Sequence, residues 1–140
     1  MMPIKDFKKA DLPNDLFFVR KPERSQGRVA IPNEIASVIG CKIGDMIVVS
    51  ARNVQTGATV TFMQRLKMTD GKLTMGKAAR EAIDIEPSPT LKRELLQKFE
   101  YPGVEFHIIA LYHAPENYES TGRPRATILS EPNTYNEETQ

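Results

Sequence analysis

The feature that most constrains this chain is an internal repeat with a constant offset of 44 residues. Residues 18–32, which read FVRKPERSQGRVAIP, align without a gap on residues 62–76, which read FMQRLKMTDGKLTMG. Phe18 falls on Phe62, and a glycine followed by a basic residue occupies the same place in both segments. Self-similarity at a fixed spacing predicts two copies of one supersecondary unit. Because each unit is too short to close a core alone, we expect the two copies to pack together.

The repeat continues into a short helix in each copy. Ile35, Val38 and Ile39 are spaced i, i+3 and i+4, which predicts one apolar helical stripe. Their counterparts in the second copy are Ala79, Ala82 and Ile83, which keep the spacing with smaller side chains. Pro32 suits the first turn of the first helix, where a missing N–H costs no hydrogen bond.

Hydrophobic patterning predicts the order of the elements along the chain. We expect strands 16–21 and 27–31, helix 33–39, strand 46–52, a turn at 55–57, strands 58–66 and 71–75, helix 77–83, an inserted helix over 90–99, strand 104–113 and a further strand over 125–130. The predicted divisions are a flexible N-terminal arm over 1–15, a first repeat over 16–57, a second, degenerate repeat over 58–130 with the helical insert within 88–99, and a flexible tail over 131–140. Strand 58–66 leaves no room for a linker, which favours one fused body over two separate ones.

The second copy contains an insertion that the first copy lacks. Ser88 followed by Pro89 is typical of a helix start, and Leu91, Leu95 and Phe99 follow at spacings of four. We expect this helix to lie on the body of the protein with that stripe inward. Its basic residues, Lys92, Arg93 and Lys98, are then expected to face outward. A dimerisation surface on the same stripe is the alternative.

Composition excludes several classes of protein. Cys41 is the single cysteine of the chain, so an internal disulfide is excluded and no cysteine cluster is present for a metal. No apolar run approaches the length of a membrane span, and the first 15 residues lack the apolar stretch of a signal peptide. We therefore expect a cytoplasmic protein with no membrane contact.

Net charge is +1 and does not by itself indicate a nucleic-acid partner. Its distribution along the chain is more informative. From Ala114 onward, five glutamates against two arginines give a balance of −3, so residues 1–113 carry +4. This mild basic bias is compatible with phosphate binding.

Few residues suggest catalytic or metal chemistry. His107 and His113 fall six apart on predicted strand 104–113, so we expect them on one face of that strand. Two histidines without a cysteine cluster are more typical of a structural or exposed role than of a metal site. Asp45, which follows a glycine, is typical of a turn whose side chain accepts backbone N–H groups. Cys41 is typical of a small buried apolar residue.

The first copy also carries a family motif. Its segments read FVRK, then GRVAIPNEI, then IGCKIGDMIVV. This pattern resembles the AbrB/SpoVT family of swapped-hairpin, looped-hinge regulators and antitoxins. The second copy resembles the family mainly through Gly71, Lys72 and the helical stripe. The resemblance implies a β-rich α+β fold, namely a swapped-hairpin or double-psi-like β-barrel formed by two ββαβ repeats.

In that family, arginines on the looped-hinge face bind duplex DNA. The resemblance and the basic clusters give these candidates for DNA contact: Arg20, Lys21, Arg24 and Arg28 in the first copy, and Lys72, Lys77 and Arg80 in the second. The family's strongest DNA binders carry arginines where this chain has Ala36 and Ser37, and Arg80 stands at the position equivalent to Ala36. Arginine's planar guanidinium suits bidentate contact with phosphate or guanine.

We therefore expect a DNA-binding transcriptional regulator that acts on double-stranded DNA as a monomer, homodimer or higher oligomer. Catalytic, metal and cofactor sites are not expected, because no nucleophile–base pair, phosphate loop or paired carboxylate is visible. No Gly-Ser dipeptide occurs, which disfavours a self-cleaving barrel enzyme. The alternative is a protein-interaction module, adaptor or antitoxin-like, with a protein partner. The low net charge, Ala36 and Ser37, and the inserted helix favour that alternative.

Overall fold

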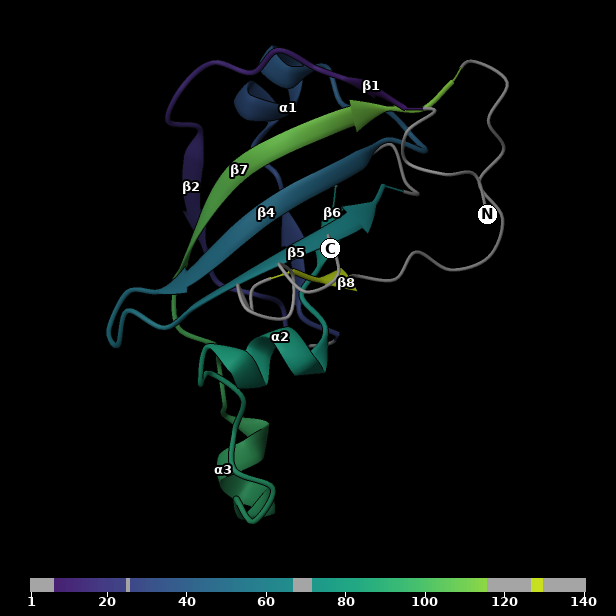
Figure 1. Ribbon diagram of the computed structural model, residues 1–140. Helices are drawn as coiled ribbons and strands as arrows, with labels where there is room; N and C mark the ends of the chain where they lie inside the picture. The colour runs from purple at the N-terminus through teal and green to yellow at the C-terminus, as the bar shows by residue number, and fades with distance from the viewer. Residues whose placement is uncertain (1–6, 25, 67–71, 116–126, 130–140) are drawn as a thin grey trace, which may run out of the picture.

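The computed structural model describes residues 7–24, 26–66, 72–115 and 127–129 (Figure 1). Its strands are β1 (Lys8–Lys9), β2 (Phe17–Arg20), β3 (Arg28–Ala30), β4 (Met46–Asn53), β5 (Thr59–Arg65), β6 (Lys72–Thr74), β7 (Val104–His113) and β8 (Thr127–Ile128). Its helices are α1 (Asn33–Ile39), α2 (Lys77–Ala82) and α3 (Arg93–Gln97). In the part of the chain that the structure describes, no helix is long and apolar enough to cross a membrane.

Two antiparallel sheets form the fold. The larger has the order β1-β7-β4-β5-β8, and β2 pairs with β7 beside β1. The smaller is a two-stranded ribbon of β3 and β6. The expected β-rich α+β class is therefore confirmed. A closed barrel is not seen among the described residues, because β3 and β6 pair with each other and leave the larger sheet with two separate edges.

The registers of the large sheet repeat at the offset seen in the sequence. Phe18 of β2 lies opposite Phe106 of β7, and its counterpart Phe62 of β5 lies opposite Val49 of β4. The first strand of each half thus pairs with the last strand of the other half. Since β4 also pairs with β7, and β3 with β6, the two halves are related by an internal two-fold.

Two residue pairs mark where this internal axis passes. Val29 of β3 lies opposite Leu73 of β6, which is its own counterpart at an offset of 44. In the large sheet Ser50 of β4 lies opposite His107 of β7. These two residues are also counterparts, because Ser50 pairs with Thr61 and His107 pairs with Phe17, and Phe17 and Thr61 are 44 residues apart. A residue lies opposite its own counterpart only on a two-fold axis. The axis therefore runs from the ribbon to the centre of the large sheet.

The core fills the space between the sheets and helices. It includes Phe18, Val29, Ile47, Phe62, Leu73, Met75, Val104, Phe106 and Leu111. Each of α1 and α2 contributes one narrow stripe, made by Ile35 and Ile39 in the first helix and by Ala79 and Ile83 in the second. Val38 and its counterpart Ala82, both expected in these stripes, are exposed, Val38 at 62%, whereas Ala36 packs against the core.

The inserted helix does not lie on the body as expected. α3 projects away from the sheets beyond α2 (Figure 1), and Leu95 is 55% exposed. Only five residues are helical, and the stripe is anchored by Phe99, which packs partly buried against the core. Lys92, Arg93 and Lys98 are exposed, as expected.

Part of the expected N-terminal arm is an edge strand. Lys8 and Lys9 pair with the end of β7, and the Ala10 N–H donates to the Leu111 carbonyl at 2.8 Å. Phe7 is buried just before them. Residues 1–6, Gly71 and the expected tail over 131–140 lie outside the described residues.

A β-bulge in β7 separates the two histidines. Consecutive residues of β4 lie opposite Ile108 and Ala110, so Ile109 is an extra residue that reverses the alternation of faces. His107 contacts Glu105 on the outer face, whereas His113 contacts Asp45, which is buried. The expectation that both histidines share a face was wrong, because the bulge falls between them.

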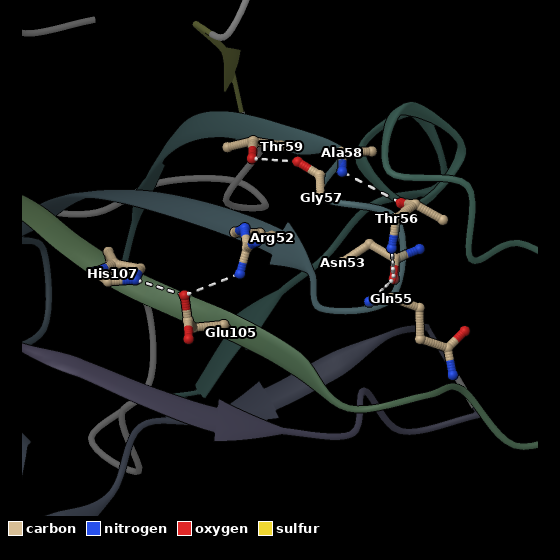
Figure 2. A network of polar contacts seen from close by, with 9 residues as sticks. All are labelled: Arg52, Asn53, Gln55, Thr56, Gly57, Ala58, Thr59, Glu105 and His107. Atoms are coloured by element: carbon tan, nitrogen blue, oxygen red, sulfur yellow. Dashed lines mark hydrogen bonds and ion pairs between the residues drawn. The ribbon is translucent and has the colours of Figure 1, made fainter.

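Polar contacts fix the β4–β5 turn and the outer face beside it (Figure 2). Asn53 Oδ1 accepts the Gln55 N–H at 2.9 Å, and Asn53 Nδ2 donates to the Ile83 carbonyl at 2.8 Å, which ties the turn to the end of α2. Glu105 Oε1 lies 2.9 Å from His107 Nε2 and 3.8 Å from an Arg52 amino group. The turn predicted at 55–57 is confirmed.

Candidate nucleic-acid interface

The β3–β6 ribbon has one buried face and one solvent face. Val29 and Leu73 point into the core, so the neighbours of each, including Arg28 and Lys72, point the other way. Arg28 lies opposite Thr74, and Lys72 lies opposite Ala30 on the same outer face. The ribbon therefore presents two cations that the internal two-fold relates to each other.

The loop before β3 orients Arg28. Its turn is closed by the Glu23 N–H donating to the Arg28 carbonyl at 2.9 Å and by the Gly27 N–H donating to the Glu23 carbonyl at 3.0 Å. Gln26 and Gly27 have consecutive positive φ angles of 69° and 65°. The Gln26 Oε1 accepts hydrogen bonds from Arg28 Nε at 3.2 Å and Nη2 at 2.9 Å. One edge of the guanidinium is thereby held, and its other amino group is left for a ligand.

The other predicted cations differ in their exposure and in their contacts. Arg20 and Lys21 are exposed at the end of β2, and Lys77 is exposed in the first turn of α2. Lys72 Nζ lies 3.5 Å from Glu23 Oε2, so part of its charge is neutralised. Arg24, also exposed, donates from Nη2 to the Leu96 carbonyl at 3.1 Å.

Arg80 is set apart from this group. Its side chain is 11% exposed, with Nε 3.0 Å from Glu86 Oε1 and the guanidinium 5.5 Å from the centre of the Tyr101 ring. It also packs against Gly27, where an added Cβ would lie 2.6 Å from Arg80 Nη1. The structure thus does not bring Arg80 to the solvent face of the ribbon.

A second polar cluster lies at the N-terminal end of β4, around Asp45. Asp45 is buried and accepts the Lys42 N–H at 2.9 Å, the Ala114 N–H at 3.0 Å and a contact from His113 Nδ1 at 2.9 Å. The expected structural turn is confirmed. Burial first, and then the Asp45 carboxylate, raise the pKa of the Cys41 thiol, which keeps that thiol protonated. Within the described ranges, no three His, Cys, Asp or Glu side chains gather as metal ligands.

Sequence reasoning missed the acceptors that hold these cations. Gln26, Glu23 and Glu86 each contact a predicted basic residue, but none stands at a spacing that marks it in a sequence. Gln26 lies two residues before Arg28, in a loop whose left-handed backbone turns the two side chains toward each other. Gly27 is the one residue whose type indicates this tight loop in the sequence.

The described residues define a small β-rich α+β protein in which the two halves exchange their first strands. No family model and no curated protein matches the chain. Its fold is similar to the solution structure of PHS018 from Pyrococcus horikoshii, with a TM-score of 0.52. That alignment covers 72% of this chain and 95% of the Pyrococcus protein at 20% identity, so the likeness concerns the fold alone.

Proposed function

We propose that this protein is a DNA-binding regulator of AbrB type that contacts duplex DNA through the outer face of the β3–β6 ribbon. The observation that carries the proposal is the pair Arg28 and Lys72, which share one solvent face and are related by the internal two-fold. A two-stranded ribbon fits the major groove of B-DNA, which is about 12 Å wide. Exchange of first strands between the halves also supports a swapped-hairpin origin for the fold.

The basic residues take different roles in this proposal. Arg28, oriented by Gln26, offers its remaining amino group to guanine or phosphate. Lys72 and the exposed Arg20, Lys21 and Lys77 contact phosphates and set the register of the protein on the duplex. Because a two-fold in the protein is matched by a two-fold in its site, we expect a pseudo-palindromic target.

An electrophoretic shift titration of the full chain with duplex DNA, repeated across salt concentrations, tests the proposal. The double variant Arg28→Ala, Lys72→Ala is expected to bind more weakly and to lower the log–log salt slope by about 0.9 for each lost phosphate contact. A matched control is Arg93→Ala, Lys98→Ala, which removes two exposed cations from the projecting insert and should leave the slope unchanged. Absence of binding by the parent chain at low salt would contradict the proposal.

A second candidate function, a protein-interaction module, is favoured by the outer face of the large sheet. Phe17 and Ile109 are 52% and 56% exposed there, beside Val19 at 49%. At the positions that the offset of 44 equates with Phe17 and Val19, the other half carries the half-buried Thr61 and Met63. The variant Phe17→Ser, Ile109→Thr should abolish a stoichiometric protein complex while DNA binding is retained. If the variant keeps the complex, this second function fails.

A further inference from the structure

A cavity of about 640 Å³ opens beside the ribbon, between the loop before β3, the end of α2 and the insert that carries α3. It is lined by Arg24, Gln26, Arg80, Leu96, Phe99 and Tyr101, together with Glu86 and a proline. Its size is within the range of about 300–1,000 Å³ that small-molecule sites have in proteins. The insert has no counterpart in the first half, so the internal two-fold does not repeat this cavity among the described residues.

The inner wall of this cavity is electropositive. Glu86 is the one carboxylate on the lining, and a single oxygen of it, Oε1, serves both Arg80 Nε at 3.0 Å and the Tyr101 hydroxyl at 2.7 Å. Within the described ranges, the Arg80 side chain has no second ion pair, and its amino groups have no hydrogen-bond acceptor. Its amino groups are therefore left to whatever fills the cavity, and a buried guanidinium gains most from an anionic partner.

The outer rim carries a second guanidinium. Arg24 reaches across from the loop and donates Nη2 to the Leu96 carbonyl at 3.1 Å, which fixes it over the insert. The remaining Arg24 donors have no other partner in the part of the chain that the structure describes. Two arginines against one glutamate leave the lining with net positive charge.

The remaining wall is aromatic and apolar. Phe99 and Tyr101 meet edge to face with ring centres 5.0 Å apart, and Leu96 adds an aliphatic surface. Burial and the hydrogen bond to Glu86 raise the pKa of Tyr101 to about 12, so its ring remains neutral. Aromatic rings beside guanidinium groups suit a planar ligand that also carries negative charge.

We propose that this cavity binds an aromatic phosphate of the size of a nucleoside monophosphate. The phosphate faces the guanidinium groups of Arg24 and Arg80, and the ring packs against Phe99 and Leu96. Gln26 lines the same cavity and holds Arg28, so occupancy alters how Arg28 is presented. This last consequence rests on the proposed DNA-binding function, whereas ligand binding itself does not.

Calorimetric titration of the full chain tests the site with AMP as the probe. We expect saturable binding of AMP, and binding weaker by about ten-fold or more for adenosine, which lacks the phosphate, and for inorganic phosphate, which lacks the ring. Arg24→Gln, at an exposed position, should weaken AMP binding by about ten-fold. Arg93→Gln is the matched control, since Arg93 is exposed on α3 but does not line the cavity.

Each outcome decides a separate point. No AMP binding, equal binding of AMP and phosphate, or an unchanged affinity in Arg24→Gln would overturn the site. The shift titration with duplex DNA is then repeated with and without saturating AMP. A DNA affinity that AMP does not change overturns the coupling and leaves the site standing. A chain that binds AMP but no DNA overturns the proposed function alone.

Discussion

The half built from β2, β3, α1 and β4 and the half built from β5, β6, α2 and β7 meet the same structural demands with different residues. Phe18 and Phe62 both enter the core from their first strands. Two residues further on the halves diverge: Arg20 is exposed, whereas Gln64 is buried and its Oε1 accepts the Thr74 N–H at 3.0 Å. Positions that build the shared core are held alike, and positions outside it are free to specialise.

The residues that end the two helices also meet one structural demand with different residue types. α1 is ended by Gly40 at φ 65°, and its counterpart Asp84, at the offset of 44, follows α2 at φ 63°. The fold requires a left-handed residue at this place in both halves, and each half supplies a different residue that can adopt it. Ala36 and Arg80 are likewise counterparts, but only Arg80 has an insert beside it to pack against.

The largest expected effect compares the two core phenylalanines. Phe62→Ala should lower the free energy of unfolding by about 3–5 kcal/mol, because the fully buried ring leaves a cavity in a strand paired on both sides. Phe18→Ala should cost less, because β2 pairs only with β7 among the described strands and can relax around the gap. Urea unfolding measures both. Equal losses would show that the edge strand is as rigid as the central one.

The second prediction uses two glycines with the same φ of 65°, Gly27 and Gly40. Gly40→Ala meets nothing within 4 Å and should cost about 1 kcal/mol, the strain of a left-handed alanine. Gly27→Ala would also bring its Cβ into overlap with the Met75 carbonyl oxygen and should cost clearly more. Thermal and urea unfolding of the two variants give the difference. If the costs are equal, the close approach of the loop to Met75 is not a constraint.

The third prediction concerns pH and the half that carries the insert. The pKa of Tyr101 is raised from 10 to about 12, mainly by burial, so the folded chain holds this phenolic proton more tightly than the unfolded chain does. The resulting stability is complete below about pH 10 and is lost as the pH rises to about 12. Tyr101→Phe should therefore flatten the fall in unfolding free energy across that interval. Urea unfolding at several alkaline pH values measures it; parallel curves for parent and variant would refute the shift.

The smallest expected effect comes from exchanging the residue types at the left-handed positions that follow α1 and α2. Asp84→Gly should raise the free energy of unfolding by at most about 1 kcal/mol, since glycine adopts a positive φ without strain. The reciprocal change Gly40→Asp should lower it by a similar amount. Differential scanning calorimetry resolves shifts of this size. A stability loss in Asp84→Gly would mean that the aspartate side chain does more than tolerate the conformation.

Much of the fold could be predicted because it depends on local patterning. Helix 33–39 and strand 104–113 coincide with α1 and β7, and the turn at 55–57 follows from its glycine. What could not be predicted depends on partners distant in the sequence. The bulge at Ile109 is visible only in the pairing of β4 with β7, and the edge strand at Lys8 needs the end of β7 to pair with.

The candidate site was predicted as a list of charges rather than as an arrangement. The family resemblance predicts Arg28, and the repeat predicts Lys72 as its counterpart, which also fixes their symmetry. Arg80 carries the same charge and is equivalent in the sequence pattern, yet Glu86 and Tyr101, which flank the helical insert, contact it and leave it nearly buried. Whether a cation reaches solvent is decided by its neighbours in space, and the repeat does not reveal these neighbours.

The exchange of first strands also sets the order in which the protein can assemble as it is made. β4 and β5 are joined by a short turn and can pair as soon as both leave the ribosome. β2 has to wait for β7, since Phe18 lies opposite Phe106. At a synthesis rate of about 5–20 residues per second, that wait lasts roughly 4–18 s. For those seconds Phe17 and Phe18 are unpaired on the nascent chain, where a chaperone or a second nascent copy can meet them.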